Sequence, residues 1–153
     1  MEVNIGGQDK NDLIREIKEK FKVSSNASDM LKNPEFTVSK TPESISLIRL
    51  KVSDLGFPKG ATTEEIYQKA EELGLELCPA ETGPQLRKQY INQPLDEWLN
   101  IGMKQIVDSD GSPNVFYLRR LGGGLWLRGS WAEPGSRWGP GHGFAFRLRK
   151  LNA

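Results

Sequence analysis

The sequence predicts an α+β fold, with N-terminal helices packed on a C-terminal antiparallel sheet of about four to five strands. Two observations indicate this arrangement. Apolar residues recur at helical spacing in the first part of the chain, whereas the last third alternates apolar with polar residues between glycine-rich turns. We expect residues 1–40 to form an N-terminal helical segment and residues 41–153 an α+β core domain, the two making one globular unit.

The N-terminal segment is expected to hold two helices. The first spans 11–21, where apolar residues recur three and four positions apart and charged residues fill the other face, with Asp9 as its N-cap. The second spans 27–32 and ends before Pro34, because proline cannot continue a helix. Residues 33–43 then connect this segment to the core domain.

The core domain is expected to begin with a strand at 45–52, which is rich in Ile, Leu and Val. Thr62 and Glu65 have capping-box spacing and predict the next helix. This helix ends at Gly74, since glycine readily adopts the left-handed conformation of a helix C-cap. A further short helix is expected near Pro84, because proline suits a first helical position.

Strands are expected in the last third of the chain, separated by an Asp-Gly turn, a Gly-Gly-Gly turn and a long Gly/Pro loop. The expected strands are 98–107, 114–121, 125–131 and 144–150. Alternation predicts that Phe144, Phe146 and Leu148 are buried under the helices. The opposite face is expected to carry Trp126, Arg128, Arg147 and Arg149, together with Arg119 or Arg120.

Composition excludes several classes of site. Cys78 and His142 are the only cysteine and the only histidine, so a disulfide within the chain and a zinc site built from several such residues are excluded. We expect no metal and no cofactor. No apolar run approaches the roughly 18 residues that span a bilayer, and the first residues lack the apolar stretch of a secretory signal. A cytoplasmic protein without a membrane partner is expected.

Charge is distributed unevenly along the chain. Residues 1–112 have a net charge of −5, whereas residues 113–153 have a net charge of +6 and contain three of the four Trp residues. Arg forks match phosphate or carboxylate oxygens, and Trp rings offer a flat surface for a base or a sugar. The pattern therefore predicts a site for an anionic ligand, a nucleic acid or an acidic protein surface. The candidate ligand-binding residues are Trp126, Arg128, Trp131, Arg137, Trp138, His142, Arg147 and Arg149. The alternative is that the acidic part packs on the basic part and that the Trp side chains fill the core.

The Gly/Pro loop 132–143 places His142 between two glycines. Such a histidine is either an ordinary exposed side chain or a general base. In the second case Cys78 or Glu81 would assist, although Cys78 lies in an apolar alternation that is typical of a buried strand. Dinucleotide, phosphate-loop and nucleophile-elbow motifs are absent from the sequence, so no catalytic residue is assigned beyond these three candidates.

The run DLGFPKGATTEEIYQKAEELGLELCPAETGPQLRKQY, followed later by EWLNIGMKQI and GGLWLRGSW, resembles a family of short conserved bacterial proteins. The resemblance runs through the chain from Asp54 onward. It implies a bacterial setting, and it carries no activity and no functional residue over to this chain.

Three function classes follow from these patterns. The first is a non-catalytic binding module that uses the Trp/Arg face and the loop 132–143. The second is a small enzyme with His142 as general base. The third is a self-associating protein, in which the acidic and basic parts of two copies attract each other head to tail.

Overall fold

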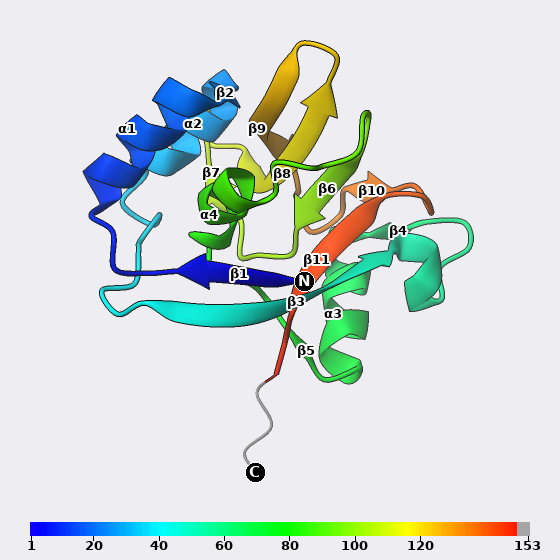
Figure 1. Cartoon of the computed structure of the whole chain (residues 1–153). Coiled ribbons are helices and arrows are strands. Elements are labelled where there is room, and N and C mark those ends of the chain that lie inside the picture. Colours follow the sequence, from blue (N-terminus) through cyan, green and yellow to red (C-terminus); the bar gives the residue numbers. More distant parts are fainter. Residues whose placement is uncertain (150–153) are drawn as a thin grey trace.

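The computed structural model describes residues 1–149, which form an α+β fold with four α-helices and one large curled sheet (Figure 1). In chain order the elements are β1 (Glu2–Ile5), α1 (Lys10–Lys20), β2 (Lys22–Val23), α2 (Ser25–Lys32), β3 (Glu43–Lys51), the 3-10 helix η1 (Val52–Leu55), β4 (Ala61–Thr62), α3 (Thr63–Glu72), β5 (Leu75–Glu76), α4 (Thr82–Gln89), β6 (Trp98–Ile101), β7 (Ile106–Val107), β8 (Pro113–Leu121), β9 (Gly124–Trp131), β10 (Arg137–Trp138) and β11 (Gly143–Leu148). The strands follow the order β1-β3-β11-β6-β8-β9-β2 across the sheet, with β5 beside β11 and β7 beside β8. A separate small sheet pairs β4 with β10.

The large sheet is mixed, and it is larger than the antiparallel sheet of four to five strands that the sequence predicted. β6 pairs with β11 in parallel, and β2 pairs with β9 in parallel. The first 40 residues contribute β1 and β2 to this sheet as well as two helices. Local alternation cannot reveal these pairings, because they join segments distant in sequence and because a strand of two residues has no alternation to detect.

The expected helices are present, with the caps that the sequence predicted. Asp9 caps α1 by accepting hydrogen bonds from two backbone N–H groups of its first turn. Thr62 and Glu65 form the capping box of α3. α4 begins at Thr82, two residues before Pro84, so the proline falls in the first turn, where a missing N–H costs no helical hydrogen bond.

Two of the expected strands differ in extent. The strand expected at 98–107 is divided into β6 and β7. Gly102, between them, lies against the ring of Phe146, where any side chain would collide, and Met103 forms an isolated bridge with Cys78. The strand expected at 144–150 corresponds to β11, which ends at Leu148, while Lys150 lies outside the described residues. The prediction that Leu148 is buried is wrong, because at the end of the strand its side chain is exposed.

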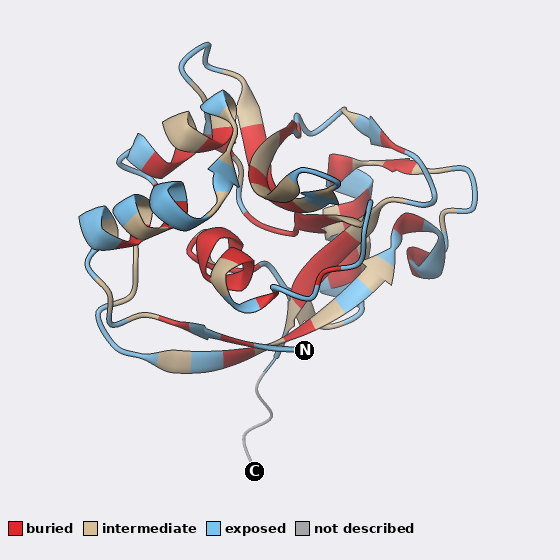
Figure 2. Ribbon diagram, turned by 45° about the horizontal axis from the view of Figure 1, so that its top comes forward, coloured by how far each residue is buried: buried red, intermediate tan, exposed pale blue. Residues whose placement is uncertain are grey.

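The sheet curls around α4, so that its inner face holds α4 together with α1 and α2 (Figures 1 and 2). Residues from Thr82 to Arg87 are all buried. A surface helix buries one stripe only, so burial on every side shows that α4 is enclosed. α3 packs on the outer face instead, where Tyr67 meets Phe146 edge to face with ring centroids 6.1 Å apart.

The register between strands assigns each side chain to one of these two faces. Phe144 pairs with Asn100, Asn100 pairs with Tyr117, and Tyr117 pairs with Arg128, so these four side chains share the outer face. Arg147, in alternation with Phe144, falls on the inner face. The prediction that Arg128 and Arg147 share a face is therefore wrong, because the register of β11 on β6 depends on strands that are distant in sequence.

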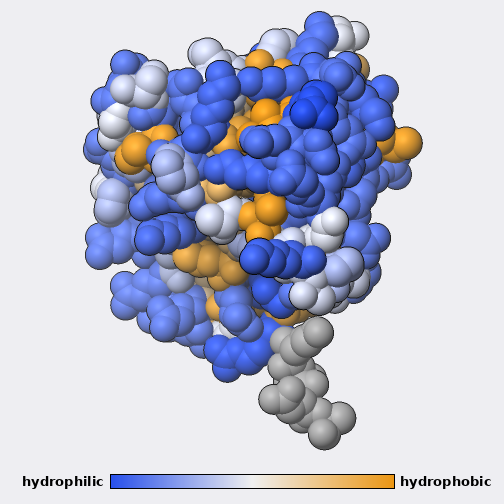
Figure 3. Space-filling model, turned by 90° about the vertical axis from the view of Figure 1, so that its left-hand side faces the viewer, coloured by the Kyte–Doolittle hydropathy of each residue, from blue (hydrophilic) through white to orange (hydrophobic). Residues whose placement is uncertain are grey.

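The side of the molecule that carries α1 is mainly hydrophilic, and hydrophobic residues show there only in small separate places (Figure 3). Within residues 1–149 no helix has the length and apolar character needed to cross a bilayer.

Candidate ligand-binding face and cleft

The outer face of β6, β8 and β9 brings aromatic rings and cations together. Across the strands, Trp98 pairs with Arg119, which in turn pairs with Trp126, while Tyr117 pairs with Arg128. Paired residues on one face of a sheet are neighbours. Lys22 joins them because β2 pairs with β9 opposite Trp126. We call this set the outer-face cluster. It consists of Lys22, Trp98, Tyr117, Arg119, Trp126 and Arg128.

The rings and cations of the outer-face cluster stack on one another. Trp98 lies on Tyr117 with ring centroids 4.5 Å apart and an angle of 20° between the planes. The guanidinium of Arg119 is 5.3 Å from the ring centroid of Trp98, and that of Arg128 is 4.3 Å from the ring centroid of Trp126. Neither guanidinium donates a hydrogen bond within residues 1–149, so the N–H donors of both remain available to an anion.

The cations of the cluster have no acidic partner among residues 1–149. Arg119, Arg128 and Lys22 form no ion pair and no side-chain hydrogen bond there. Arg147, in contrast, lies 2.7 Å from the carboxylate of Glu43. The outer-face cluster therefore carries uncompensated positive charge beside flat apolar surface.

A cleft of about 740 Å³ opens next to this cluster. It lies between the end of β3, the start of β6 and the turn that precedes β11. Trp98 belongs both to the cluster and to the cleft, so the two are continuous. The cleft is lined by Arg49, Leu50, Lys51, Asp54, Asp96, Glu97, Trp98, Leu99, Gly141, His142 and Gly143.

The charges of the cleft are only partly satisfied internally. Arg49 donates to a carboxylate oxygen of Glu97 at 3.2 Å, and Asp54 accepts the backbone N–H of Lys51 at 2.8 Å. The side chains of Lys51 and Asp96 have no partner within residues 1–149. Asp96 also has a φ of 66°, and within that range it is the one residue other than glycine in the left-handed region. Such a conformation costs of order 1 kcal/mol and is a reason to examine a position for function.

His142 stands at the mouth of the cleft between two indoles. Its ring is edge-on to Trp98 at 5.1 Å and to Trp138 at 5.4 Å between centroids. Burial lowers the pKa of His142 below its usual value, so the imidazole is neutral at neutral pH. Neither ring nitrogen makes a hydrogen bond within the described chain, and both can serve a ligand.

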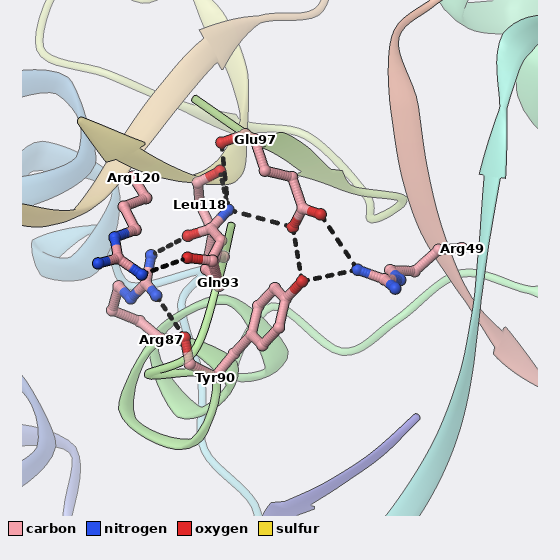
Figure 4. A network of polar contacts seen from close by, with 7 residues as sticks. All are labelled: Arg49, Arg87, Tyr90, Gln93, Glu97, Leu118 and Arg120. Atoms are coloured by element: carbon pink, nitrogen blue, oxygen red, sulfur yellow. Dashed lines mark hydrogen bonds and ion pairs between the residues drawn. The ribbon is translucent and has the colours of Figure 1, made fainter. Parts of the chain in front are cut away.

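A polar network on the inner face fixes one wall of the cleft (Figure 4). Arg87 is fully buried and donates to Gln93 Oε1 and to the carbonyl of Tyr90, both at 2.7 Å. Burial lowers the pKa of Arg87 to about 10, so it remains charged at neutral pH. The hydroxyl of Tyr90 donates to Glu97 at 2.8 Å. The network therefore holds Glu97 in a defined place at the cleft wall.

The structure separates the eight predicted ligand-binding residues into groups. Trp126 and Arg128 lie in the outer-face cluster, and His142 lies in the cleft. Trp138 is almost fully buried behind His142, and its indole N–H donates to Thr63 Oγ1 at 2.8 Å. The remaining four lie elsewhere. Trp131 is exposed, and its register in β9 places it on the inner side of the sheet, while Arg137 is exposed on β10. Arg147 forms an ion pair with Glu43, and Arg149 forms one with Glu76.

Several residues of the site were not expected from the sequence. Trp98, Tyr117 and Lys22 were not predicted, and Asp96 was not singled out. Tyr117 and Arg119 are two positions apart on one strand, as are Trp126 and Arg128, so each pair shares a face of the sheet. This spacing is a signal in the sequence that identifies Tyr117. The position of Lys22 depends on a parallel pairing that no local pattern carries.

The other two catalytic candidates, Cys78 and Glu81, are buried in the fold. Burial raises the pKa of the Cys78 thiol to about 12, which opposes formation of a thiolate. Glu81 is buried and accepts backbone N–H groups of Gly6 at 2.7 Å and Ser39 at 2.8 Å. Neither residue lines the cleft beside His142. Within residues 1–149 no group of three or more His, Cys, Asp or Glu residues is placed to hold a metal ion.

Comparisons with protein-family models, with curated proteins and with solved structures found no match. The resemblance to a bacterial family therefore stays a prediction.

Proposed function

We propose that this chain is a non-catalytic binding module that holds a single-stranded nucleic acid on its outer-face cluster. The observation that carries the proposal is the alternation of rings and cations on β6, β8 and β9 without an acid among them. Stacking of bases on aromatic rings and attraction of phosphates to cations are the two components of single-strand binding.

The arrangement suits a single strand better than an isolated anion. Arg119 and Arg128 lie over half-exposed indoles, so one unit of the ligand can place a phosphate at the guanidinium and a flat ring beside it. Arg137 and Arg15, in contrast, lie over no aromatic ring within residues 1–149. A nucleic acid strand that lies along the cluster meets the cations of β2, β9 and β8 in succession.

Fluorescence anisotropy with labelled single-stranded DNA and RNA of about 20 nucleotides, measured over a range of salt concentrations, tests the proposal. Three phosphate contacts to a single strand predict a slope of about −2 for log affinity against log salt concentration. The double variant Arg119→Gln/Arg128→Gln should lose at least about tenfold in affinity at low salt and should show a slope closer to −0.7.

Arg15→Gln is the matched control, because Arg15 is an exposed arginine on α1 and is paired with Asp12. This variant should bind like the wild type. No binding of the wild type at low salt, or equal affinity in the double variant and the control, would contradict the proposal. Mass measurement at low and high salt runs alongside, because a salt-sensitive dimer would favour head-to-tail self-association instead.

A further inference from the structure

The cleft beside the outer-face cluster has a chemical character opposite to that of the cluster. Its rim carries the carboxylates of Asp54 and Asp96, and its wall carries that of Glu97. Lys51 and Arg49 provide positive charge, but Arg49 is already engaged by Glu97. Excess carboxylate repels a phosphate and accepts hydrogen bonds from N–H groups. A nucleic acid strand would therefore place its phosphates on the cluster and present only a base to the cleft.

We propose that the cleft is a base-specific subsite that takes a guanine of the bound single strand. This inference rests on the proposed function. Leu50 and Leu99 supply apolar wall, and Trp98 lines the side next to the cluster. The cavity volume is in the range that accommodates a small organic ligand, and it is large enough for one nucleotide.

The donors and acceptors of the cleft select guanine among the bases. The Watson–Crick edge of guanine presents two adjacent N–H donors and one carbonyl acceptor, whereas adenine, cytosine and uracil do not combine these groups. Asp96 offers both carboxylate oxygens without an internal partner in the described chain, and it can accept the two donors side by side. Lys51 Nζ or a ring nitrogen of His142 can donate to the carbonyl.

The conformation of Asp96 supports this role. Its left-handed backbone is held in place because its N–H donates to the carbonyl of Arg120 at 2.8 Å. Glu97, the next residue, is fixed by Tyr90 and Arg49. The backbone of Asp96 is thus fixed before a ligand arrives, which reduces the conformational entropy lost on binding.

The test compares four strands of equal length, in which a single central nucleotide of an oligo-U strand is U, A, C or G. The wild type should bind the strand with G about tenfold more tightly than the others, as one good bidentate base contact provides. Asp96→Asn replaces one acceptor oxygen by an NH₂ donor and is compatible with a left-handed backbone. It should bring the four affinities together without weakening binding of the oligo-U strand.

Asp110→Asn is the matched control, because Asp110 is an exposed acid in the turn between β7 and β8. It should retain the preference for G. Equal binding of the four strands by the wild type, or a preference for G that survives in Asp96→Asn, would overturn the inference and leave the proposed function in place. Failure of every strand to bind at low salt would overturn the proposed function, and the inference with it.

Discussion

The arginines of the inner and outer faces of the sheet have opposite environments. Arg87, on the inner side, is fully buried and ends in hydrogen bonds to Gln93, Tyr90 and the backbone of Trp126. Arg119 and Arg128, on the outer side, are half-exposed and stack on indoles without an acidic partner among residues 1–149.

This difference distinguishes an arginine that makes internal hydrogen bonds from arginines that remain available to a ligand. A buried guanidinium is tolerated when hydrogen bonds offset its lost hydration, and Arg87 makes such bonds through both terminal nitrogens, whereas its Nε–H has no partner within residues 1–149. Arg87 therefore contributes to the fold and to the cleft wall. A half-exposed guanidinium keeps its hydration, and its N–H groups can exchange water for phosphate oxygens.

The largest expected effect is on Arg87. Arg87→Ala should lower the free energy of unfolding by about 3–5 kcal/mol, because it opens a cavity and leaves buried acceptors without donors. Urea denaturation measures this loss. Arg128→Ala should change the free energy of unfolding by less than about 1 kcal/mol, since its side chain makes no buried hydrogen bond. Similar losses in the two variants would remove the distinction between the faces.

The next effect is on Glu81, the buried acid of the inner side. Glu81→Gln should cost about 2 kcal/mol, because an amide NH₂ replaces one oxygen that now accepts the backbone N–H of Gly6 or Ser39. Nucleic acid binding at low salt should be unchanged in this variant. A loss of binding with little loss of stability would instead favour a role for Glu81 in the site.

The smallest effect is at Glu16, which joins α1 to α4. Hydrogen bonds from Gln8, Lys88 and Lys20 lower the pKa of Glu16 from 4.5 to about 2. Its folded pKa is lower than its unfolded pKa, so this carboxylate stabilises the fold above pH 4.5 and loses that contribution as the pH falls toward 2. Glu16→Gln should therefore cost about 1 kcal/mol or less at pH 7, since the pair is only partly buried.

Denaturation of the wild type and of Glu16→Gln at several pH values measures this contribution. The difference between the two proteins should shrink below pH 4.5 and disappear near pH 2. A difference that is constant over this range would show that the amide changes the packing of α1 on α4 and not the charge.

The elements that the sequence predicted well are those specified by local chemistry. The N-cap at Asp9 and the capping box of Thr62 and Glu65 are confirmed, since capping involves residues two or three positions apart. The α+β class is confirmed as well. The size and mixed pairing of the sheet were not predicted, because β11 lies between β3 and β6 through contacts that no short window contains.

The same limit applies to the candidate site. Trp126 and Arg128 share a face because they are two residues apart on one strand, and alternation predicted this. Arg147 lies on the opposite face. The sequence did not predict this, because the position of Arg147 relative to Arg128 depends on three successive registers across β11, β6, β8 and β9. An error of one residue in any register moves a side chain to the other face.

The four tryptophans allow ligand binding at the outer-face cluster to be measured directly, because they report on different places. Trp98 and Trp126 belong to the outer-face cluster, Trp138 is buried behind His142, and Trp131 is exposed on the opposite register. A two-dimensional NMR titration of the indole N–H signals with a single-stranded oligonucleotide at low salt follows all four at once. The signals of Trp98 and Trp126 should shift together, and the signal of Trp131 should stay in place. A shift of Trp131 alone, or no shift of Trp98 and Trp126 at saturating oligonucleotide, would contradict binding at the outer-face cluster.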